Sequence, residues 1–125
     1  MCCRASIAYI SRFTLGKQLL GISPKIIIDN WFVDAFADNA VAIGAITNAN
    51  YSAVAIGATT NASCYGIALG NNAYANQRSF AAGSFACACA EDTIAIGATA
   101  KATMPRAIAI GKSACAECIG DVCVQ

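Results

Sequence analysis

A short motif recurs six times from residue 41 onward in this 125-residue chain, and its spacing constrains the fold more than any other feature. Each copy reads large apolar residue, alanine, apolar residue, glycine. The glycines follow one another at intervals of 13, 13, 13, 14 and 14 residues, at Gly44, Gly57, Gly70, Gly83, Gly97 and Gly111. A repeat this short is typical of a solenoid, in which each copy forms one coil that packs against its neighbours.

Large and small residues alternate with period two on both sides of each glycine, which predicts two short strands per coil. The glycine supplies a corner position without a Cβ atom. Stacked coils then give two parallel sheets, and at about 4.8 Å per strand six coils make a rod roughly 29 Å long. The predicted fold is an all-β parallel β-roll, or solenoid, over residues 38–118. A non-repeating cap or docking segment precedes it at residues 1–37, and a closing segment follows at residues 119–125.

We place the large aliphatic residues inside the roll, because packed sheets normally stand about 10 Å apart and small side chains alone would leave voids. This predicted core comprises Val41, Ile43, Val54, Ile56, Ile67, Leu69, Ile94, Ile96, Ile108 and Ile110. The alanine column two residues before each glycine then faces outward as an uncharged stripe that favours contact with another chain. That predicted interchain stripe comprises Ala42, Ala55, Ala68, Ala81, Ala95 and Ala109. The reverse arrangement, with Ile and Val between chains, stays open, and both arrangements predict an oligomer.

Another column accepts amide, phenol, thiol and ammonium side chains, so it must face solvent. From this column and a nearby corner, Asn48, Asn61, Tyr74 and Phe85 form a candidate ligand surface, since exposed aromatic residues are useful in recognition. Ordinary surface with asparagine ladders is the alternative. An ice-binding solenoid is a further alternative, although the row two residues after each glycine is mixed rather than uniform: Ile46, Thr59, Asn72, Phe85, Thr99 and Ser113.

The repeat [SAT]-[VI]-A-[IL]-G followed by x-x-[AT]-x-A resembles that of YadA-like trimeric autotransporter adhesin heads, over about residues 38–117. The resemblance implies a left-handed parallel β-roll, three chains packed around a threefold axis, and a role in attachment to surfaces.

Composition argues against several classes of function. A net charge of +1 gives no electrostatic footprint for nucleic acid. The chain has no histidine, which excludes a Ser-His-Asp triad, and no carboxylate pair recurs beside a base or nucleophile. We therefore expect no enzyme, no cofactor and no metal. The uncharged stretch at residues 39–77 carries glycine and asparagine at regular intervals, which argues against a membrane span.

Eight cysteines are present: Cys2, Cys3, Cys64, Cys87, Cys89, Cys115, Cys118 and Cys123. They lack the paired spacing of a zinc site. Residues two apart on a strand lie roughly 6.5–7 Å from each other, too far for an easy bridge between Cys87 and Cys89. Small, buried or half-buried spacers are the favoured interpretation of the thiols, and disulfides stay open.

The first 37 residues lack the repeat. Residues 7–20 are loosely periodic for a helix, and residues 26–33 are typical of a strand. Arg12 and Lys17 interrupt the apolar stretch that a secretory signal needs. We therefore expect a structural or adhesive component of a virion, such as a viral fibre or decoration protein. It would dock to the particle through residues 1–37 and face a host-surface receptor. The alternative is the head of a bacterial trimeric autotransporter adhesin at the cell surface.

Overall fold

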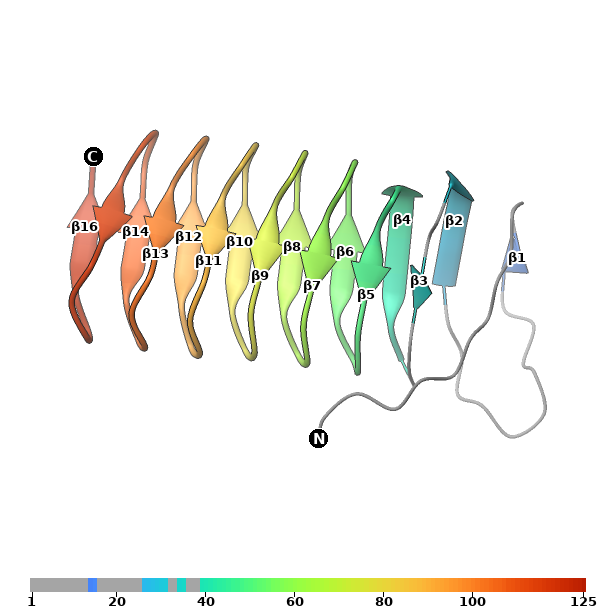
Figure 1. Cartoon of the computed structure of the whole chain (residues 1–125), viewed down its shortest axis with the longest axis horizontal. Coiled ribbons are helices and arrows are strands. Elements are labelled where there is room, and N and C mark those ends of the chain that lie inside the picture. The colour runs from blue at the N-terminus through green and yellow to red at the C-terminus, as the bar shows by residue number, and fades with distance from the viewer. Residues whose placement is uncertain (1–13, 16–25, 32–33, 36–38) are drawn as a thin grey trace.

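The computed structural model describes residues 14–15, 26–31, 34–35 and 39–125, with the side chains from residue 39 onward. In these residues every regular element is a strand, and the strands form two sheets. Figure 1 shows the coils stacked side by side along the long axis, ending at the C-terminus. The prediction of an all-β parallel solenoid of about six repeat coils is confirmed.

The larger sheet, here called sheet A, has nine strands in spatial order. They are β1 (Thr14–Leu15), β2 (Ile26–Trp31), β4 (Val41–Ala45), β6 (Val54–Ile56), β8 (Ile67–Leu69), β10 (Phe80–Ala82), β12 (Ile94–Ile96), β14 (Ile108–Ile110) and β16 (Val122–Val124). Sheet B has seven strands of two residues each. They are β3 (Asp34–Ala35), β5 (Asn48–Ala49), β7 (Asn61–Ala62), β9 (Tyr74–Ala75), β11 (Cys87–Ala88), β13 (Lys101–Ala102) and β15 (Cys115–Ala116).

The coils stack in register, so equivalent residues of the repeat form straight columns. In sheet A, Ala68 pairs with Ala55 on one side and Ala81 on the other. In sheet B, Tyr74 lies between Asn61 and Cys87. Backbone hydrogen bonds join each coil to the next. Because the register is constant, the chemistry of a column is uniform along the rod.

The interior of the roll consists of small side chains from both sheets. The alanine column before the glycines is fully buried, and so is the column of Ala49, Ala62, Ala75, Ala88, Ala102 and Ala116 on sheet B. The largest fully buried side chains are Thr47, Thr60, Thr93 and Cys64. The two sheets therefore pack methyl against methyl, closer than the roughly 10 Å that sheets with large side chains need.

This interior corrects our prediction of the two columns. The predicted interchain stripe (Ala42, Ala55, Ala68, Ala81, Ala95 and Ala109) is 0% exposed in a single chain, so it cannot contact another chain. The predicted core is equally wrong: Val41, Ile43, Val54, Ile56, Ile67, Leu69, Ile94, Ile96, Ile108 and Ile110 point outward from sheet A and are half-buried or exposed. Strands of two or three residues leave no room for two layers of large side chains. The structure has the reverse arrangement.

Each coil turns through backbone conformations with positive φ. The residue two after each repeat glycine and the residue five before it both have φ between 51° and 62°. Gly70 has a φ of 132°, and a Cβ atom there would lie 2.5 Å from the carbonyl oxygen of Gly83 in the next coil. The corner glycines therefore allow both the turn and the close stacking of coils.

The sheets also include strands outside residues 38–118. The parallel strand β2 pairs with β4, and β3 pairs with β5, so both sheets continue on the N-terminal side of the first repeat. The predicted strand at residues 26–33 corresponds to β2. Of the predicted helix at residues 7–20, Thr14–Leu15 is strand β1 and the rest lies outside the described residues, as does most of the predicted cap. At the other end, β16 pairs with β14 and adds a last sheet A strand.

Candidate interaction surfaces

The outer face of sheet A is an apolar band without charge. It comprises Val41, Ile43, Val54, Ile56, Ile67, Leu69, Phe80, Ala82, Ile94, Ile96, Ile108 and Ile110, and we call it the aliphatic face. Ile56, Ile67, Ile96 and Ile110 are 36–37% exposed although they stand in the middle of a sheet. At about 4.8 Å per strand the band runs roughly 25–30 Å along the rod. A continuous apolar band of this kind is typical of a protein–protein interface.

The outer face of sheet B is polar and chemically varied. Its two columns are Asn48, Asn61, Tyr74, Cys87, Lys101 and Cys115, and then Asn50, Ser63, Asn76, Cys89, Thr103 and Glu117. The Oδ1 atoms of Asn48 and Asn61 are buried and have no hydrogen-bond partner. The two faces of the roll therefore differ sharply, one aliphatic and one made of amides, thiols and a cation.

The candidate ligand residues only partly come together. Asn48, Asn61 and Tyr74 are successive residues of one ladder on β5, β7 and β9. Phe85 is 57% exposed but belongs to the positive-φ corner between β10 and β11, in the mixed row with Ile46. A second aromatic pair, Tyr51 and Tyr65, packs edge to face with ring centroids 5.5 Å apart.

One ion-pair network follows the coil period. Arg78 pairs with Glu91 and, at 2.8 Å, with Asp92, and all three side chains are exposed. The hydrogen bond from Arg78 lowers the pKa of the Asp92 carboxyl group. Sequence reasoning read Glu91 and Asp92 as a solvated corner and missed Arg78. The signal was available, since Arg78 lies 13 and 14 residues before them, which is one coil.

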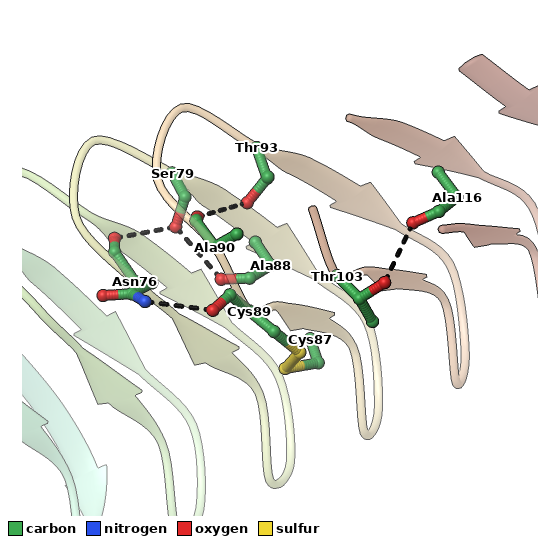
Figure 2. Close-up of a disulfide and its surroundings, with 9 residues drawn as sticks. All are labelled: Asn76, Ser79, Cys87, Ala88, Cys89, Ala90, Thr93, Thr103 and Ala116. Carbon is green, nitrogen blue, oxygen red and sulfur yellow. Dashed lines mark hydrogen bonds between the residues drawn. A yellow bond between two sulfur atoms is a disulfide. The ribbon is translucent and has the colours of Figure 1, made fainter. Parts of the chain in front are cut away.

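A disulfide joins Cys87 and Cys89, with their Cα atoms 5.1 Å apart. The expectation that these residues are too far apart is wrong, because β11 ends at Ala88 and Cys89 lies where the chain leaves the strand. Figure 2 shows the bridge beside Ala88, with the Asn76 amide donating to the Cys89 carbonyl oxygen at 3.0 Å. The neighbouring turns are held by Thr93 Oγ1, which donates to Ala90 O at 2.7 Å, and by Ser79 Oγ, which donates to Asn76 O at 2.7 Å.

The remaining thiols differ from this pair. Cys64 is fully buried and disulfide-bonded. Cys115, Cys118 and Cys123 are free. Cys115 donates to Glu117 Oε1 at 3.2 Å, and this hydrogen bond raises the pKa of the Cys115 thiol. In the described part of the chain, His, Cys, Asp and Glu form no group of three that could hold a metal ion. Within the same residues no helix has the length and hydropathy to cross a membrane.

Comparison with known proteins agrees with this architecture. Residues 90–114 match the family model of the YadA head domain repeat, in two copies. The fold is similar to the collagen-binding domain of the Yersinia adhesin YadA, with a TM-score of 0.60 and 20% sequence identity, covering 94% of this chain and 82% of that one. A search of curated proteins finds no match. The resemblance stated from the sequence is thus confirmed: the chain carries YadA-type head repeats and folds as a YadA-like head.

Proposed function

We propose that this chain is the adhesive head of a trimeric autotransporter adhesin, exposed at a cell surface. The observation that carries the proposal is the contrast between the two faces of a YadA-like roll. The aliphatic face supplies a surface for assembly, and the outer face of sheet B supplies a repeated polar surface for attachment.

The aliphatic face favours a homotrimer. An interior of alanine buries little apolar area per residue, so an isolated roll gains little stability from its own core. The Ile and Val columns, half-buried in one chain, lose their remaining exposure when three copies meet along a common axis. The YadA-like repeat supports three as the number of copies, and the side chains of sheet B then face away from the axis.

Attachment would be multivalent. Each trimer presents three copies of the Asn48, Asn61 and Tyr74 ladder on one rigid rod. Weak contacts made by three linked faces add through effective concentration, by about 10²- to 10⁴-fold. The similar Yersinia domain is described as collagen-binding, so proteins of the extracellular matrix, collagen among them, are the first ligands to test.

The particle-borne role remains a second candidate. The same roll would serve as a fibre on a virion, docked through residues 1–37. The adhesin head has the better support, since the family repeat and the similar structure both belong to an adhesin.

Sedimentation analysis and binding to immobilised collagen and other matrix proteins test the proposal together. We expect a trimer that binds at least one matrix protein, and we expect Ile96→Asp on the aliphatic face to give monomers with at least 10²-fold weaker binding. Asn61→Asp on sheet B is the matched control and should leave the trimer intact. A wild-type monomer contradicts the assembly, and a trimer that binds no surface ligand contradicts the adhesive role.

A further inference from the structure

The Cys87–Cys89 disulfide lies on the outer face of sheet B, where neither the fold nor the proposed trimer needs it. Both residues are half-buried rather than enclosed. The bridge is thus open to a reagent from solvent, whereas the disulfide-bonded Cys64 is fully buried.

The strand that carries the bridge is held independently of it. The backbone N–H of Cys87 donates to Ala100 O and that of Cys89 to Ala102 O, both at 2.8 Å. Ala88 between them is fully buried in the core. The bridge closes a loop of only three residues, so it restricts the unfolded chain very little. The disulfide can therefore open while β11 keeps its place in the sheet.

A cation lies beside one of the two sulfur atoms. Lys101 on β13 is the register partner of Cys87, one strand spacing of about 4.8 Å away on the same face. The nearby acids Glu91 and Asp92 are already paired with Arg78. A neighbouring ammonium group stabilises a thiolate, which makes Cys87 the better leaving group of the pair.

No described free thiol is placed to attack the bridge from within the chain. Cys115 is two strands away from Cys87, about 9.6 Å, which is beyond disulfide reach. Its hydrogen bond to Glu117 also keeps it in the thiol form. The attacking thiolate must therefore come from another molecule.

We propose that the Cys87–Cys89 disulfide is a thiol-exchange site that captures exposed cysteine thiols of other proteins. The incoming thiolate attacks Cys89 Sγ and forms a new sulfur–sulfur bond. The Cys87–Cys89 bond breaks, and its electron pair leaves on Cys87 Sγ as a thiolate beside Lys101. One disulfide replaces another, so no oxidant or reductant is consumed. The product is a covalent but reversible link between the roll and its partner.

The test follows the exchange by mass spectrometry at constant pH. The oxidised wild-type chain is incubated with 2-mercaptoethanol, a neutral thiol, and quenched with acid at intervals. Trypsin cleavage after Arg78 and Lys101 releases residues 79–101, which contain no cysteine other than this pair. We expect a mixed disulfide on Cys89, an unreacted Cys64, and an unchanged circular dichroism spectrum.

Matched lysine variants test the role of the cation. Lys101→Gln should slow the opening about threefold for each unit by which the pKa of the leaving thiol rises. Lys112→Gln removes an exposed lysine at a corner of the roll and should leave the rate unchanged. A second arm uses a small folded protein with one exposed cysteine, which should form a covalent adduct on a non-reducing gel.

Three results would overturn the proposal. They are a bridge that stays closed in millimolar thiol while the roll is folded, equal rates in the two lysine variants, and loss of the sheet signal on opening. Reaction with 2-mercaptoethanol but not with the protein thiol would reject protein capture. The assembly state is measured separately, so failure here leaves the proposed trimer untouched.

Discussion

Ala68→Val tests the all-alanine interior directly. Ala68 is 0% exposed, stands between Ala55 and Ala81 in sheet A, and faces the equally small side chains of sheet B. Valine adds two carbon atoms where the coils repeat every 4.8 Å or so and no side chain larger than threonine is fully buried. Overpacking of a dense core costs about 1–3 kcal/mol, and we expect the upper end, about 3 kcal/mol, because neither neighbouring coil can move without breaking register.

The matched control is Ile67→Val, one residue earlier on β8. Ile67 points outward and is 37% exposed, so the loss of one partly buried methylene costs about 0.5 kcal/mol. Both variants are unfolded in urea and followed by circular dichroism at one protein concentration, because assembly couples to stability. Equal tolerance of the two substitutions, or a larger loss for Ile67→Val, would refute the arrangement of the columns.

Three further predictions address single contacts. Gly83→Ala should cost at least about 3 kcal/mol, since its Cβ would lie 2.5 Å from Gly97 O at a φ of 133°, whereas Gly120→Ala, with a φ of 72° and open space around it, should cost about 1–2 kcal/mol in the same urea experiment. Thr60→Val should stabilise the roll by about 1–2 kcal/mol, because it removes a buried hydroxyl without a hydrogen-bond partner; a lower urea midpoint would contradict this. The Arg78–Asp92 pair should give a small, salt-sensitive stabilisation. The lowered pKa of Asp92 means that this stabilisation is full above pH 4 or so and is lost as the pH falls further, so Arg78→Gln should differ from wild type at pH 7 and match it at pH 2.

The repeat was enough to predict the strands, their parallel stacking and the solenoid. A period of two separates the faces of a strand but does not say which face is inside. Both Ala42 and Val41 are apolar, and the usual preference for large residues inside fails where strands are two or three residues long. The burial of alanine therefore required the structure.

The Cys87–Cys89 bridge was missed for a different reason. Regular strand geometry separates such residues by too much, and the sequence does not mark where β11 ends. The contact of Arg78 with Asp92, in contrast, follows from the coil period and was within reach of sequence reasoning.

Mass in solution, measured by light scattering at micromolar concentration, tests the central claim most directly. A head that assembles through its aliphatic face should show three times the chain mass of 12.8 kDa. Ile96→Asp should reduce the wild-type value to that of one chain without loss of the strand signal. A wild-type chain that is folded, stable and alone in solution would contradict the account.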